Sequence, residues 1–212
     1  MKIRSLLELN QFLDGELGWR KKELTTVKLM LGSLRPHERR AMLRAGLCLL
    51  YAHWEGFVKN AAISYVTYVS TRGLKYCELT PNFVALGLRG KIKESGASNR
   101  SSLHTKLVSL LMSDLKDQAY LIPDTAVDTA SNLNFDVFEE VVCVLGLNRH
   151  RYLSRKVLID ERLVRNRNAL AHGQYLEIEE DEYLDLHSNV IDVVELFRTD
   201  LENAAATSAY RA

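Results

Sequence analysis

The sequence has few residues that interrupt helices. Its 212 residues include three prolines and 11 glycines, which leaves long uninterrupted stretches. Within these stretches, apolar residues recur every three or four positions more often than they alternate. The sequence therefore predicts an all-α fold.

Cysteine is also scarce, because the chain has three, Cys48, Cys77 and Cys143. They are odd in number, widely spaced and form no CxxC pair, so we expect reduced thiols and an intracellular protein. The six histidines do not cluster with metal-ligand spacing. We therefore expect no zinc site, no other metal and no cofactor.

The chain also has no marked excess of positive or negative charge. With 28 Lys and Arg against 27 Asp and Glu, the net charge is +1, so nothing draws the whole chain to nucleic acid or membranes. The most apolar stretch, Ala45–Ala52, is too short to span a bilayer, and Glu8 and Asn10 break the apolar start that a signal peptide would need. We expect a cytoplasmic protein in which any RNA contact is local.

The length and patterning indicate a single all-α domain over residues 1–212, with a variable insertion at 74–134. We expect a helical bundle around a long central helix at about 36–72 and a second helix at about 154–172. Further helices are expected at 3–31 (jointed near Gly15 to Gly18, with Arg20, Lys21 and Lys22 exposed), at 103–116 and after Asn134. A last helix is expected to open with the acidic run 177–182. Residues 89–102 read as a mobile loop whose Arg89, Lys91, Lys93 and Arg100 are either solvated or track an RNA backbone.

Two polar residues, His53 and Glu55, interrupt the most apolar part of the central helix. One interpretation is a hydrogen-bonded core histidine and a Glu55–Lys59 pair at i,i+4 spacing. The other is that either side chain reaches the basic helix at 154–172 and orients Arg165 or Arg167. The residues alone leave both open.

The helix at 154–172 carries the strongest functional signal. Arg167 and Asn168 fall on the two stripes that should face the core, where a structural helix would carry aliphatic residues. A buried guanidinium is costly unless it is paired or functional. His172 follows one turn later, and Gly173 is the residue expected just past a helix end. This combination predicts a site.

Arg167 and His172 also form an R-x4-H pattern within the run Arg-Asn-Ala-Leu-Ala-His-Gly, residues 167–173. This run resembles the motif of the HEPN superfamily, in the form found in stand-alone prokaryotic proteins linked to toxin–antitoxin and phage-defence loci. Residues 51–57 resemble the helix that such proteins carry before their catalytic helix. The resemblance is best over 36–72 and 154–206, and it implies an all-helical, metal-independent endoribonuclease that acts as a dimer.

A ribonuclease of this kind needs a base for the 2′-hydroxyl proton, an acid for the leaving 5′-oxygen and fixed positive charge at the phosphate. We expect His172 to move protons, Arg167 to bind phosphate and Asn168 to assist as the third catalytic residue, supported by Arg162 and Arg165. One histidine cannot easily be acid and base at once. A homodimer with the site at its two-fold interface would supply a second.

Two other functions fit the same residues. The chain could be a HEPN-like module that binds RNA, a nucleotide or a protein without cleaving anything. It could also be a helical bundle unrelated to nucleic acid, with Arg165 and Arg167 paired to Glu55 or to carboxylates of the last helix. If it is a toxin, a cognate antitoxin protein is an expected partner.

Overall fold

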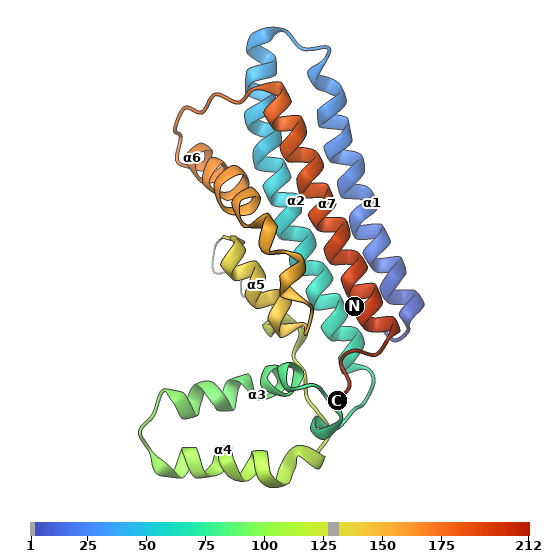
Figure 1. Ribbon diagram of the computed structural model, residues 1–212, viewed down its shortest axis with the longest axis vertical. Coiled ribbons are helices and arrows are strands. Elements are labelled where there is room, and N and C mark those ends of the chain that lie inside the picture. The colour runs from blue at the N-terminus through green and yellow to red at the C-terminus, as the bar shows by residue number, and fades with distance from the viewer. Residues whose placement is uncertain (1–2, 127–131) are drawn as a thin grey trace.

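The computed structural model describes residues 3–126 and 132–212, and in these residues the regular structure is helical apart from two isolated bridges. Three long helices lie side by side (Figure 1), with α2 and α7 running in one direction and α1 in the other. They are α1 (Leu6–Leu31), α2 (Pro36–Ser70) and α7 (Glu180–Ala206). The predicted all-α fold is confirmed. No helix in the described part combines the length and the apolar character needed to cross a bilayer.

Helix α1 begins with a capping box, in which the Ser5 hydroxyl accepts from the Glu8 N–H at 3.1 Å and the Glu8 carboxylate accepts from the Ser5 N–H at 3.0 Å. The expected joint near Gly15 and Gly18 is absent, and the helix is continuous. Buried leucines on both sides of the glycines fall on one stripe and hold it straight: Leu9, Leu13, Leu17, Leu24 and Leu31. Their burial outweighs the ~1 kcal/mol that each helical glycine costs.

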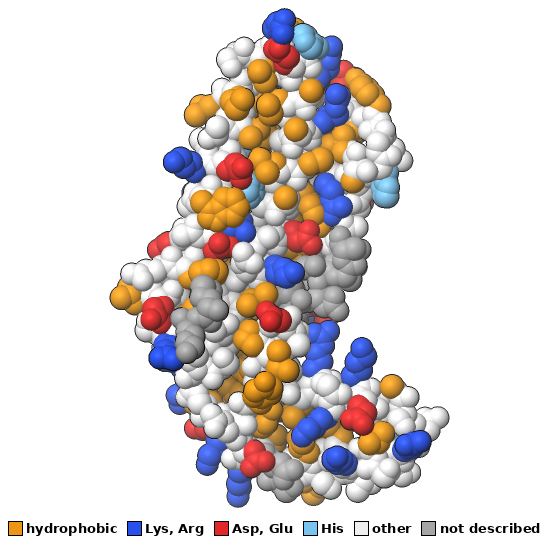
Figure 2. Space-filling model, turned by 180° about the vertical axis from the view of Figure 1, so that it is seen from behind, with side chains coloured by type: hydrophobic (Ala, Val, Ile, Leu, Met, Phe, Trp, Pro, Cys, Tyr) orange, Lys and Arg blue, Asp and Glu red, His pale blue; other side chains and the backbone are white. Residues whose placement is uncertain are grey.

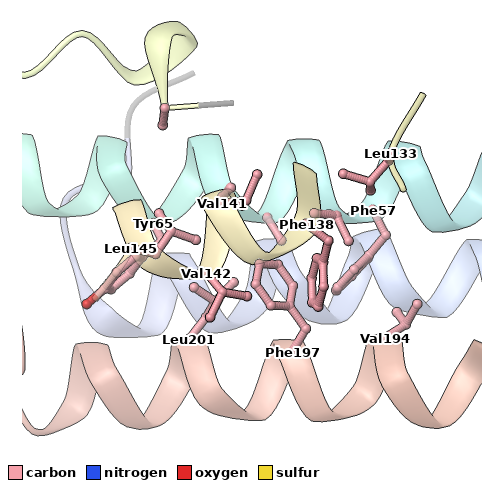
Figure 3. Close-up of a cluster of buried hydrophobic side chains, with 14 of the residues drawn as sticks. Phe57, Tyr65, Leu133, Phe138, Val141, Val142, Leu145, Val194, Phe197 and Leu201 are labelled. Carbon is pink, nitrogen blue, oxygen red and sulfur yellow. The ribbon is translucent and has the colours of Figure 1, made fainter. Parts of the chain in front are cut away.

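Helix α2 is the most buried element, as predicted, and it starts with Pro36 at its first turn. Helix α5 (Phe135–Val144) packs against it. The Asn134 side chain caps α5 by accepting from the Val137 N–H at 2.9 Å, and Gly146 ends that region with a φ of +70°. Figure 3 shows Phe138, Val141 and Val142 of α5 in one cluster with side chains of α2 and α7. The α2 residues are Phe57 and Tyr65, and the α7 residues are Phe197 and Leu201.

The region expected to be a mobile loop at 89–102 is mostly helical. Helix α3 (Pro81–Gly96) and helix α4 (Ser101–Ser113) form a hairpin that projects from the bundle (Figure 1). The helical prediction for 103–116 is therefore right and the loop prediction wrong, because Leu88 and Leu110 pack together and order both helices. The hairpin has five Lys and Arg and one Glu, and Figure 2 shows its basic side chains exposed.

The stretch expected to be one α-helix at 154–172 changes its winding along its length. After a 3-10 turn at Leu153–Arg155, a π-helix covers Leu158–Arg165 and α6 covers Asn166–Ala171. Two adjacent buried pairs, Leu158–Ile159 and Leu163–Val164, are five residues apart. A π-helix, with its i→i+5 hydrogen bonds, keeps both pairs on the core side, whereas an α-helix would turn the second pair away by about 140°.

Candidate functional site

The C-terminal end of α6 presents His172 to solvent. Gly173 adopts a φ of +72°, and the Gln174 N–H donates to the carbonyl of Ala169 at 2.9 Å while the Gly173 N–H donates to that of Leu170 at 3.0 Å. This pattern ends the helix with a left-handed residue, for which glycine is suited. The predicted role of Gly173 is confirmed, and the exposed side chain of His172 lies at the helix end.

His172 lines a hollow of about 540 Å³, which we call the outer groove. Asp160, Arg165 and Asn168 line it from the same helical stretch, and Asn134, the residue before α5, lines it as well. Its carboxylates are engaged, because Glu161 accepts from Arg165 at 2.9 Å and Asp160 accepts from the Phe135 N–H at 2.7 Å. The outer groove thus joins an imidazole, an amide and an arginine on one accessible wall.

Arg167 lies on the other side of α6, facing α2, beside which α6 packs (Figure 1). Its guanidinium carbon is 3.7 Å from the centroid of the Tyr51 ring, and one guanidinium nitrogen donates to the side-chain oxygen of Asn132. Five residues along an α-helix correspond to a rotation of about 140°. Arg167 is accordingly not among the residues that line the outer groove with His172.

The two side chains that contact Arg167, Tyr51 and Asn132, are neutral. Burial raises the pKa of the Tyr51 hydroxyl, which also accepts from the Leu133 N–H at 2.8 Å. Arg167 forms no ion pair with a carboxylate of residues 3–126 and 132–212, and its buried Nε has no hydrogen-bond partner. Its charge is stabilised by a π face and an amide dipole, and no described carboxylate pairs with it.

The other two arginines predicted to support the site are paired with carboxylates. Arg165 is exposed and pairs with Glu161 within its own helix. Arg162 donates to Asp185 of α7 at 2.8 Å and to the Glu182 carbonyl at 3.4 Å, which ties the π-helix to α7. One alternative is a helical bundle unrelated to nucleic acid, in which Arg165 and Arg167 pair with Glu55 or with carboxylates of the last helix. Neither arginine makes such a pair in the described part of the chain, so this expected pairing is wrong for both.

His53 is a correction to the predicted site. Its Nε2 lies 2.8 Å from Glu23 Oε2, and its ring packs edge-on against Trp19 of α1 with centroids 5.0 Å apart. His53 follows Tyr51 by two residues, about 200° around α2, so it faces α1 when Tyr51 faces α6. It therefore cannot orient Arg165 or Arg167.

Glu55 follows Tyr51 by four residues and lies on the same side of α2. Among the residues that the structure describes, Glu55 forms no ion pair with Lys59 or with an arginine, so the expected Glu55–Lys59 pair is not observed. The Glu55 carboxylate helps to raise the pKa of the Tyr51 hydroxyl, and its role in orienting Arg165 or Arg167 stays a prediction. Tyr51 and Asn132, which do contact Arg167, were missed. Tyr51 could have been found from its place one turn before Glu55, whereas Asn132 is 35 residues from Arg167 and gives no local signal.

A sequence model of HEPN_MAE_28990-like HEPN proteins matches residues 9–210. The match includes both helices of the site, with Tyr51, Arg167 and His172. Neither a curated protein nor a solved structure matches the chain. Among the described residues, no group of three or more His, Cys, Asp or Glu is placed to hold a metal ion.

Proposed function

Because the chain belongs to the HEPN_MAE_28990-like HEPN family, which ties it to RNA- or nucleotide-related function, we propose that it is a metal-independent endoribonuclease. Its biological role would be that of the toxin in a toxin–antitoxin or phage-defence system. One observation carries the proposal: Arg167 lies over Tyr51 without an ion pair to any described carboxylate, on the helix whose C-terminal end presents His172.

The chemistry needs no group beyond the RNA and the protein. The 2′-oxygen attacks the adjacent phosphorus, its proton leaves to an imidazole, and the bond from phosphorus to the 5′-oxygen breaks as that oxygen receives a proton. The products are a 2′,3′-cyclic phosphate and a 5′-hydroxyl. His172 serves the proton transfers, and Asn168, which lines the same groove, donates to a phosphate oxygen.

Arg167 enters this scheme through an exchange of partners. Its present acceptor is the neutral amide oxygen of Asn132. A phosphate oxygen carries negative charge and accepts more strongly from a guanidinium. We propose that the Asn132 oxygen occupies a position that a phosphate oxygen takes when RNA binds, so that Arg167 stabilises the charge that builds up on the phosphorane.

One imidazole cannot easily act as acid and base at once, and a two-fold dimer would supply a second His172. A mixing experiment tests this. If each site needs both copies, wild-type protein re-equilibrated with a ninefold excess of the His172→Ala variant should lose about tenfold in activity per wild-type subunit, because about one wild-type subunit in ten then meets another. Undiminished activity per wild-type subunit would mean that each copy acts alone.

The proposed activity is tested by incubating RNA with wild type and the His172→Ala variant in EDTA. Wild type should cleave, and the variant should lose at least about 100-fold in rate, the usual size of a general acid–base contribution. His37→Ala, which removes another exposed histidine, is the matched control and should cleave normally. Cleavage that survives His172→Ala, or that requires a divalent metal, contradicts the proposal.

The second candidate is a HEPN-like module that binds RNA, a nucleotide or a protein without cleaving. The observation in its favour is that Arg167 contacts Asn132 and Tyr51 and does not line the outer groove. Expression in a host cell separates the two. A ribonuclease toxin halts growth, and His172→Ala or a bound antitoxin relieves the arrest, whereas a binding module gives RNA retention with intact RNA and no arrest.

A further inference from the structure

A second hollow lies on the α2 side of α6, next to the outer groove. It has a volume of about 420 Å³, and Arg44 and Cys48 of α2 line it together with Gln174 and Tyr175, which follow α6. We call it the inner hollow. Gln174 lines the outer groove as well, so the two hollows meet at this residue. A strand that passes His172 would reach the inner hollow within a short distance.

Tyr175 is an aromatic ring without a protein core around it, since 75% of the residue is exposed. The guanidinium carbon of Arg44 lies 5.5 Å from its ring centroid. Arg44 forms no ion pair with a carboxylate that the structure describes, although Arg39, little more than a turn earlier, pairs with Glu180 at 3.1 Å. The inner hollow therefore offers an open aromatic face and a free cation side by side.

The remaining wall of the inner hollow is neutral. Burial raises the pKa of the Cys48 thiol, against the opposing influence of the nearby Arg167, so this cysteine is a poor nucleophile. The carboxylates of Glu177 and Glu179 are not among the lining groups. Positive charge without a competing carboxylate favours a phosphate, and an exposed ring favours a base.

We propose that the inner hollow binds one nucleobase of a single-stranded RNA, next to the nucleotide whose phosphate lies at His172. Tyr175 stacks on the base, Arg44 holds a flanking phosphate, and the Gln174 side-chain amide bonds to the edge of the base. The volume is within the range of small-ligand sites. This inference rests on the proposed ribonuclease function, because it names the part of the substrate beside the reacting phosphate.

The test measures binding apart from cleavage. A short single-stranded RNA containing 2-aminopurine is titrated into the His172→Ala protein in EDTA, and its fluorescence reports stacking. Tyr175→Ala should weaken binding about tenfold and abolish the quenching, because stacking of one base contributes roughly 1–3 kcal/mol. Tyr175→Phe keeps the ring and should bind normally. Tyr120→Ala, at another exposed tyrosine (72%), is the matched control.

Arg44→Gln supplies the second arm. It should reduce the slope of log affinity against log salt by about one, as loss of one phosphate contact does. Lys22→Gln, at an exposed position of α1, should leave the slope unchanged. Circular dichroism shows whether each variant is folded, and the exposure of Tyr175 leads us to expect that its substitutions are.

The outcomes separate this inference from the ribonuclease proposal. RNA binding that depends on Tyr175 in a protein that cleaves nothing supports the nucleobase site and contradicts the ribonuclease. Cleavage by Tyr175→Ala with an unchanged KM, together with unchanged quenching, overturns the nucleobase site and leaves the ribonuclease standing.

Discussion

Arg20 and Arg167 occupy two comparable places in this molecule, since each guanidinium lies over an aromatic ring against α2. Arg20 is 4.3 Å from the Trp19 ring centroid, and Arg167 is 3.7 Å from that of Tyr51. They differ in the groups that accept their hydrogen bonds. Arg20 donates to the Glu16 carboxylate at 2.9 Å, whereas Arg167 donates to the amide oxygen of Asn132.

The charge of Arg20 is paired within the protein. Glu16 also accepts from the Asn60 amide at 2.6 Å, so the carboxylate and the guanidinium satisfy one another with help from α2. Gly56 lets the arginine approach, because a Cβ there would lie 3.1 Å from the guanidinium. Such an arrangement holds two helices together and leaves no charge for a ligand.

Arg167, by contrast, pairs with no carboxylate of residues 3–126 and 132–212. A cation kept near the protein surface without a counter-ion is poised for an anion that arrives from outside. The difference teaches that burial of an arginine alone does not mark a site; the missing counter-charge does. Three substitutions and one pH dependence probe this comparison, ordered by the size of the expected effect.

The largest effect is expected for Arg20→Met. It leaves the Glu16 carboxylate, whose side chain is 17% exposed, without its cation. Breaking a buried pair in this way costs about 3 kcal/mol of unfolding free energy, which denaturant unfolding measures. Adding Glu16→Gln to the variant should recover part of the loss. An unfolding free energy equal to that of wild type would refute the view that this pair is structural.

Arg167→Met should have a small effect on stability and a large effect on RNA cleavage. No described carboxylate loses a partner, so the unfolding free energy should change by no more than about 1 kcal/mol, mostly from the lost contact with Tyr51. RNA cleavage should fall by about 100-fold or more, because a preorganised donor to the phosphorane is gone. A variant that unfolds readily yet cleaves at the wild-type rate would reverse the assignment of the two arginines.

The sequence predicts much of this fold and only part of the difference between the arginines. The bounds of α1, α2 and α5 follow from caps, prolines and periodic leucines, which are local signals. The sequence also predicts that Arg20 is exposed, as part of a basic triplet with Lys21 and Lys22. That prediction is wrong, since Arg20 is 5% exposed, because Glu16 one turn earlier supplies its counter-charge.

The site shows the same limit. Arg167 and His172 stand out in the sequence, but their separation to two sides of α6 depends on winding and on partners far along the chain. The five-residue spacing of Leu158–Ile159 and Leu163–Val164 is a readable signal of the π-helix, and a reading on a 3.6-residue period overlooks it. The position of Asn132 depends on tertiary packing, which no local pattern encodes.

A third substitution makes the surroundings of Arg167 resemble those of Arg20. Asn132→Asp gives Arg167 a carboxylate, as Glu16 does for Arg20. The unfolding free energy should rise by at most about 1 kcal/mol, and cleavage should fall about tenfold, because the phosphate must now displace an anion. Asn132→Ser, which shortens the side chain without adding charge, is the control. Equal rates for the Asp variant and wild type would show that Arg167 does not meet the phosphate.

The smallest effect concerns pH and His53, which belongs to the Arg20 side of the comparison. Burial lowers the pKa of His53 below its ordinary value of 6.5, and Arg20 acts in the same direction, although Glu23 opposes both. As the pH falls below about 6.5, the unfolded chain therefore binds a proton at His53 before the folded one does. The unfolding free energy decreases until the pH reaches the pKa of His53 in the folded state. Thermal unfolding at pH 7.5 and 5.5 should show the lower melting temperature at pH 5.5. His53→Gln should remove part of that difference in melting temperature, and the remainder fits His187, whose pKa burial also lowers.

The two arginine variants should change this pH dependence differently. Arg20→Met should reduce the difference in melting temperature, because one of the two influences that lower the pKa of His53 is lost, whereas Arg167→Met should leave it unchanged. If Arg167→Met narrows it as much as Arg20→Met does, the two sides of α2 are coupled and the two arginines do not act in separate neighbourhoods.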